Sequence, residues 1–110
     1  MITTPDKWII ISISKQEYNT IYKVFASWAG GYLNGDSWQL NSGIKEIKRV
    51  EDNYIITGFS GSQYVCGVNQ YGIIGNHNQL VLENIKSKAE QNDWEIKELS
   101  RDYQFENLLS

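Results

Sequence analysis

The stretch Lys7–Ser14, KWIIISIS, decides the fold class, because it is a run of apolar and β-branched residues that favours a β-strand. Residues 20–28, TIYKVFASW, alternate with a period of two, as a strand does when its two faces meet different surroundings. The polar segment 15–19, KQEYN, separates the two stretches. Together they predict an antiparallel β-hairpin with its first strand well covered.

Shorter runs of strand-forming residues follow the hairpin, at 37–41, 44–50, 54–59 and 63–68. Turn residues separate the last three runs, with Glu-Asp-Asn at 51–53 and Ser-Gly-Ser at 60–62. The apolar residues of 44–50 fit a helical turn or a bulged strand, and the strand is favoured because 51–53 then forms its turn. Segment 29–36, AGGYLNGD, is rich in glycine, Asn and Asp, which predicts an irregular loop.

Residues 78–92 predict the one clear helix. Its apolar stripe consists of Leu82, Ile85 and Ala89, with Val81 beside it. Asn76 or Asn78 is the predicted N-cap, since an Asn side chain accepts hydrogen bonds from first-turn N–H groups. A last strand is predicted at 94–99, with no partner specified. The charged tail 100–110 keeps aromatic and leucine residues, so it either docks as a short helix, which is favoured, or stays loose until a partner covers it.

These elements predict the α+β class. We expect residues 1–110 to form one domain, a mostly antiparallel β-meander of about five to seven strands with one amphipathic helix packed on one face. The 110-residue length is typical of one domain, and 41% apolar with 21% charged residues is ordinary for a globular protein.

The charge pattern argues against long nucleic acids as partners. The net charge is −3, and the densest basic cluster, KEIKR at 45–49, is interrupted by Glu46 and followed by Glu51 and Asp52. A protein that binds a phosphate backbone normally presents a basic face. A small anionic ligand remains compatible with this composition.

We expect a cytoplasmic protein with no membrane partner. No stretch approaches the ~20 apolar residues of a membrane span. The opening MITTP lacks the basic and apolar regions of a signal peptide. Cys66 is the only cysteine, which excludes an internal disulfide.

Residues suited to catalysis are few. Cys66 lies in the apolar run YVC, where a thiol is usually buried and inert. His77 is the only histidine, and Asp36 becomes its acid–base partner only if the fold brings the two together. No spacing matches a metal site, a P-loop or a dinucleotide-binding motif. We therefore expect a non-enzyme with no cofactor and no metal.

Segment 28–43 carries most of the functional signal, because aromatic residues bracket its glycines. A similar element, GFSGSQY, follows at 58–64. Aromatic rings stack on bases, and the N–H groups of glycine-rich turns bind anions. In the alternative interpretation, both segments are structural turns whose aromatic side chains close the ends of the core. The predicted ligand-binding residues are Trp28, Gly30, Gly31, Tyr32, Asp36, Ser37, Trp38, Asn41, Ser42, Ser60, Gly61 and Ser62.

Residues 28–44, WAGGYLNGDSWQLNSGI, resemble a segment of small uncharacterised bacteriophage proteins, and a weaker likeness extends over 8–71. The resemblance implies a phage context, and thus the cytoplasm of a host cell. Small acidic phage proteins often act as counter-defence factors, which sequester a nucleotide signal or coat a host protein.

Two functions are therefore expected and remain open. The first is a non-enzymatic, homo-oligomeric binding protein that captures a small anionic nucleotide. The second is a protein–protein inhibitor of a host enzyme that uses loop 28–43 as its contact surface, since Trp and Tyr are frequent in binding hot spots.

Overall fold

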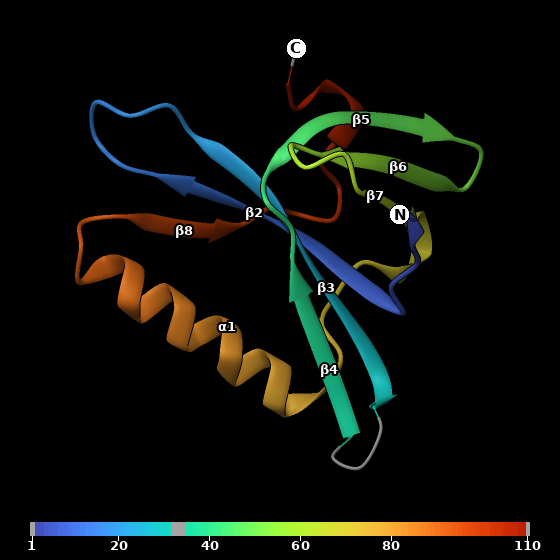
Figure 1. Ribbon diagram of the computed structural model, residues 1–110, viewed down its shortest axis with the longest axis horizontal. Helices are drawn as coiled ribbons and strands as arrows, with labels where there is room; N and C mark the ends of the chain where they lie inside the picture. The colour runs from blue at the N-terminus through green and yellow to red at the C-terminus, as the bar shows by residue number, and fades with distance from the viewer. Residues whose placement is uncertain (1, 32–34, 110) are drawn as a thin grey trace.

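The predicted hairpin forms the centre of a four-stranded antiparallel sheet (Figure 1). Strand β2 (Lys7–Ser14) pairs with β3 (Ile21–Gly31), as predicted. Strands β4 (Gly35–Leu40) and β8 (Glu95–Glu98) complete the order β4-β3-β2-β8. The computed structural model describes residues 2–31 and 35–109. The strand predicted at 94–99 therefore has β2 as its partner.

A second four-stranded sheet has the order β1-β7-β6-β5. Its strands are β1 (Ile2–Thr3), β5 (Ile44–Val50), β6 (Asn53–Gly58) and β7 (Gln63–Gly67). β5, β6 and β7 are joined by the predicted turns, and β5 carries a bulge near its start. β1 pairs parallel to β7 and was not expected. The predicted α+β class, with mostly antiparallel strands and one packed helix, is therefore confirmed, and the short connection after β4 carries the chain from one sheet into the other.

An aromatic cluster fills the space between the sheets, with Trp8 at its centre. Its indole ring meets Tyr54, Tyr71 and Phe105 edge-on, at centroid distances of 5.8, 4.8 and 5.5 Å. The indole N–H donates to the Gly67 carbonyl at 2.7 Å, which satisfies its one polar atom. Such aromatic pairs add about 0.5–1.5 kcal/mol each beyond the area that they bury. Trp8 of β2 thereby links the first sheet to Tyr54 of β6 in the second.

The C-terminal tail docks into this cluster. Its 3-10 turn η2 (Phe105–Asn107) places Phe105 in the core with 2% of its surface exposed. The alternative of a loose tail is therefore excluded for this segment. The tail docks because Phe105 is apolar, and burying a Phe side chain gains about 1.5–3 kcal/mol of stability.

Helix α1 (Gly75–Glu90) covers the opposite face of the β4-β3-β2-β8 sheet (Figure 1). Because strand side chains alternate, Trp8 and Ile10 point to the aromatic cluster while Ile9 and Ile11 point to the helix side, where Leu82 is buried. Both faces of β2 are covered, which explains its nearly continuous apolar sequence. No helix in the part of the chain that the structure describes is long and apolar enough to span a membrane.

Two local predictions were wrong. Neither Asn76 nor Asn78 caps the helix; it begins after Ile74, which makes no side-chain cap hydrogen bond. Asn78 is instead buried, and its Nδ2 donates to the Ser37 carbonyl at 3.0 Å. Segment 29–36 is not wholly irregular, since β3 runs to Gly31 and β4 starts at Gly35. The pairing of the two strands shifts register between Trp28 and Gly31, as at a β-bulge. Pairing with a neighbouring strand outweighs the weak strand preference of glycine, which a bulge readily accommodates.

Candidate functional site

The two tryptophans of segment 28–43 lie on opposite faces of one sheet. In the β3–β4 ladder, Trp28 is opposite Ser37 and Trp38 is opposite Ser27, so their positions alternate. Trp28 packs against the core between the sheets and donates its indole N–H to the Thr4 carbonyl at 3.0 Å. The structure therefore does not bring the two rings together around one ligand.

Trp38 lies on the helix side of the sheet and is 41% exposed. Its ring stacks on buried Phe25, with centroids 5.5 Å apart and an angle of 4° between the planes. Phe25 is buried in the core, so it supports the indole through this stacking contact. Trp38 is thus an accessible aromatic surface that the core supports.

Asn41 is an architectural residue. It is 6% exposed, and its Oδ1 accepts a hydrogen bond from the Val24 N–H at 2.9 Å. Its Nδ2 donates to the Gly43 carbonyl at 3.3 Å, while its own N–H donates to the Val24 carbonyl at 3.2 Å. The side chain thereby replaces a backbone group at the end of the β3–β4 ladder, and both of its polar atoms are already occupied.

The remaining predicted residues of this loop lie in β3 and β4 or between them. Gly30 and Gly31 end β3, Asp36 belongs to β4, and Gly31 lies opposite Gly35. Ser37 is exposed on β4. Tyr32 lies outside the described residues.

Two turns that are distant in the sequence lie in contact. The Ser60 N–H donates to Ser42 Oγ at 3.2 Å, and the two hydroxyl oxygens are 3.4 Å apart. The Phe59 N–H donates to the Gly43 carbonyl at 2.9 Å. We call the surface formed by Ser42, Gly43, Phe59 and Ser60 the serine corner. Gly61 and Ser62 close the same β6–β7 turn, since the Gly61 N–H donates to the Gly58 carbonyl and the Gly58 N–H to the Ser62 carbonyl.

Phe59 is the residue of the serine corner that the sequence analysis missed. This residue is 61% exposed, and its ring lies against Gly43, where an added Cβ would be 2.6 Å from Phe59 Cδ2 and Cε2. Ile21 approaches the same point, with its Cγ2 at 3.6 Å. The available signal was an aromatic residue directly before the Ser-Gly-Ser turn. Gly43 is required here, both for this contact and for its φ of +133°.

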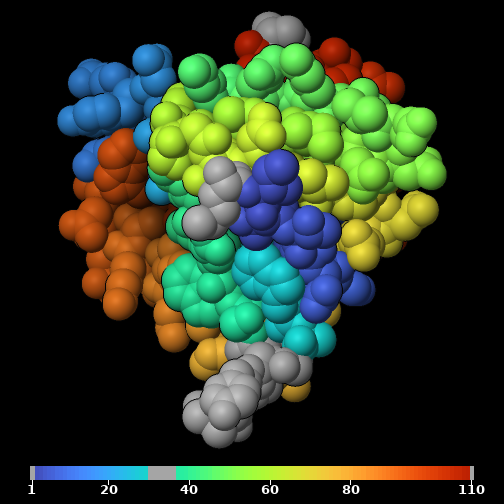
Figure 2. Space-filling model, turned by 45° about the vertical axis from the view of Figure 1, so that its right-hand side comes forward, coloured from blue at the N-terminus to red at the C-terminus, as the bar shows by residue number. Residues whose placement is uncertain are grey.

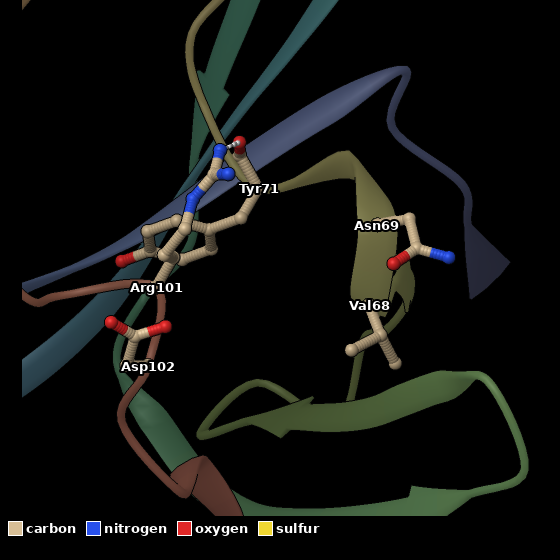
Figure 3. A pocket seen from close by; sticks show the side chains of 5 residues that line it. All are labelled: Val68, Asn69, Tyr71, Arg101 and Asp102. Atoms are coloured by element: carbon tan, nitrogen blue, oxygen red, sulfur yellow. Dashed lines mark hydrogen bonds between the residues drawn. The ribbon is translucent and has the colours of Figure 1, made fainter.

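A polar cavity of about 250 Å³ lies elsewhere (Figure 3). It is lined by Val68, Asn69, Tyr71, Arg101 and Asp102. Figure 3 shows Arg101 and Asp102 on one side and Val68 and Asn69 on the other, with an Arg101 guanidinium N–H donating to the Tyr71 carbonyl at 3.2 Å. No sequence signal pointed to it, because its walls come from segments about thirty residues apart.

The two residues considered first for catalysis, Cys66 and His77, lie in different environments. Cys66 is buried in the core, and burial raises the pKa of its thiol, which keeps it protonated. His77 is exposed in the first turn of α1. Burial also raises the pKa of the Tyr64 hydroxyl, and the charge interaction with Cys66 raises it further. Within residues 2–31 and 35–109, no group of three or more His, Cys, Asp or Glu residues is placed to hold a metal ion.

In comparisons with known proteins, no protein-family model, no curated protein and no solved structure matches this chain.

Proposed function

We propose that this protein is a non-enzymatic binding protein that captures a small anionic nucleotide at the serine corner. The observation that carries the proposal is the position of the exposed Phe59, whose ring lies against Gly43 and which directly precedes Ser60, the residue hydrogen-bonded to Ser42. An aromatic face accepts a stacked base, and a serine hydroxyl can donate to a phosphate oxygen.

The geometry around the corner supports both halves of such a ligand. Stacking on Phe59 does not depend on the identity of the base, since every base has a π-face. The exposed residues Ser42 and Ser60 belong to turns, and the exposed Lys45 follows in β5. A lysine near the turns supplies a positive charge for a phosphate group. In the phage context that segment 28–44 suggests, such a protein acts as a counter-defence factor by removing a nucleotide signal.

The test is a thermal-shift screen against mono-, di- and cyclic nucleotides. A ligand at 100 times its Kd stabilises the folded protein by about 2.7 kcal/mol, which is a clear rise in Tm. Phe59→Ala is expected to lose about 1–3 kcal/mol of affinity, the usual value of one stacked base. Tyr103→Ala is the matched control, because Tyr103 is also an exposed aromatic residue but packs against Phe105 in the tail. No shift with any nucleotide, or equal affinity in Phe59→Ala, would exclude the proposal.

The second candidate function is inhibition of a host protein. It is favoured by the apolar part of the same surface, where the exposed side chains of Phe59 and Ile21 adjoin at Gly43. Exposed apolar side chains of this kind also anchor protein–protein contacts. A protein that shows no nucleotide shift but inhibits a host enzyme in a Phe59-dependent manner would support this candidate over the first.

A further inference from the structure

The part of the chain that the structure describes has four edge strands, and β4 is the least protected of them. β1 has two residues and β8 has four, three of them charged. β5 is longer but carries the basic and acidic residues of KEIKR. β4 has six residues, only one of them charged, and exposes Trp38. Natural proteins protect sheet edges with short strands and charges, so an open, nearly uncharged edge indicates a pairing surface.

The hydrogen-bond pattern shows which backbone groups of β4 face outward. The Asn41 N–H donates to the Val24 carbonyl, so this pair is a hydrogen-bonded position of the ladder. In an antiparallel ladder such positions alternate, which makes Ala26–Gln39 the next one. Trp38 and Leu40 lie between these positions and direct their N–H and C=O groups away from β3. Figure 2 shows the green part of β4 at the molecular surface, between the orange of α1 and the cyan of β3.

We propose that β4 pairs antiparallel with β4 of a second copy of this chain, around a two-fold axis at Trp38. The outward N–H and C=O groups of Trp38 then bond to the same groups of the other Trp38. The next hydrogen-bonded position joins Leu40 to Asp36 of the second copy. The pairing continues the β4-β3-β2-β8 sheet across both subunits.

A second copy fits this edge because the edge is complementary to itself. A two-fold interface uses the same patch on both subunits, so each donor meets the equivalent acceptor. The single charged residue of the strand, Asp36, is placed opposite a leucine and not opposite its own copy. The two Trp38 side chains lie on the same face of the extended sheet, where directly opposite aromatic residues stabilise pairing. The short ladder predicts a reversible dimer that depends on protein concentration, and the pairing does not rest on the nucleotide proposal.

The first test measures association of the unmodified protein together with amide hydrogen exchange. Sedimentation is expected to show a monomer–dimer equilibrium. Exchange at Trp38 and Leu40 should slow as the concentration rises, whereas Gln39, which bonds to β3 in either state, should not change. A clean monomer at high micromolar concentration would overturn the proposal, as would a dimer with unchanged exchange at Trp38 and Leu40.

The second test uses Trp38→Pro with Trp38→Phe as its control. Proline removes the outward N–H without removing a bond to β3, because proline is tolerated in an edge strand where its nitrogen faces solvent. We expect Trp38→Pro to be monomeric and Trp38→Phe to remain dimeric. A dimer that persists in a folded Trp38→Pro would place the interface elsewhere and contradict the pairing. If Trp38→Pro does not fold, the exchange measurement on the unmodified protein decides.

Discussion

The hydroxyl of Tyr71 donates a hydrogen bond to the Leu99 carbonyl at 2.7 Å, and thereby joins β2 to the chain that follows β8. The same oxygen accepts a hydrogen bond from the Ile10 N–H at 3.1 Å. Ile10 and Leu99 form the next position of the β2–β8 ladder, where the Leu99 N–H donates directly to the Ile10 carbonyl. The tyrosine hydroxyl therefore replaces one of the two backbone bonds at this position.

Tyr71→Phe is expected to destabilise the protein by about 2 kcal/mol, because the Ile10 N–H and the Leu99 carbonyl both lose their partner. Tyr103→Phe is the control, since Tyr103 is 44% exposed and packs on Phe105 through its ring. Urea denaturation of both variants measures the difference. Equal free energies of unfolding for Tyr71→Phe and the unmodified protein would show that the bridge contributes no stability.

The same hydroxyl predicts a pH dependence. Burial raises the pKa of Tyr71 to about 12, with the Ile10 hydrogen bond opposing this and Glu98 adding to it. Below pH ~10, tyrosine is protonated in both the folded and the unfolded chain, so stability does not depend on this group. Above pH ~10, Tyr71 ionises in the unfolded chain before it ionises in the folded one. The free energy of unfolding therefore falls by up to about 1.4 kcal/mol per pH unit because of this group. The stability advantage over Tyr71→Phe should therefore shrink between pH 10 and 12; a constant difference across this range would contradict the assignment.

Gly43→Ala is expected to cost about 2 kcal/mol or more, because the new Cβ meets the Phe59 ring and the backbone has positive φ. Gly61→Ala separates these two causes, since Gly61 also has positive φ but a Cβ added there would meet no atom within 4 Å. We expect Gly61→Ala to lower the free energy of unfolding by about 1 kcal/mol, from backbone strain alone. The double change Gly43→Ala with Phe59→Ala should recover part of the loss. Equal costs at the two glycines would show that Phe59 moves aside freely.

Trp38→Ala is expected to lower stability by about 1–2 kcal/mol, well below the roughly 3–5 kcal/mol of a fully buried aromatic residue. The reason is that Trp38 is 41% exposed, although its indole stacks on Phe25. Trp8→Ala is the comparison, since Trp8 is 1% exposed at the centre of the aromatic cluster. Thermal denaturation of dilute samples measures both. Comparable losses in the two variants would mean that Trp38 belongs to the core.

The candidate site was predicted only in part. The sequence analysis placed Ser42 and Ser60 in two separate glycine-containing segments, and the hydrogen bond that joins them follows from the tertiary structure. The separation of Trp28 from Trp38 was not predicted, because the face that a strand residue occupies depends on register and on the bulge after Trp28. The cavity beside Tyr71 had no local signal, since its walls meet only in the folded chain.

The sequence by itself determined the elements whose causes are local. Periodic apolar residues specified the hairpin and most of α1, and turn residues specified the links between β5, β6 and β7. Only the tertiary structure decided how the strands divide into two sheets and which side chain ends the β3–β4 ladder. It also decided that helix α1 begins at Gly75 and that Asn78, a predicted cap, is buried against β4. These choices depend on contacts between residues that are distant in the chain, and burial and backbone hydrogen bonding at those contacts outweigh local preference.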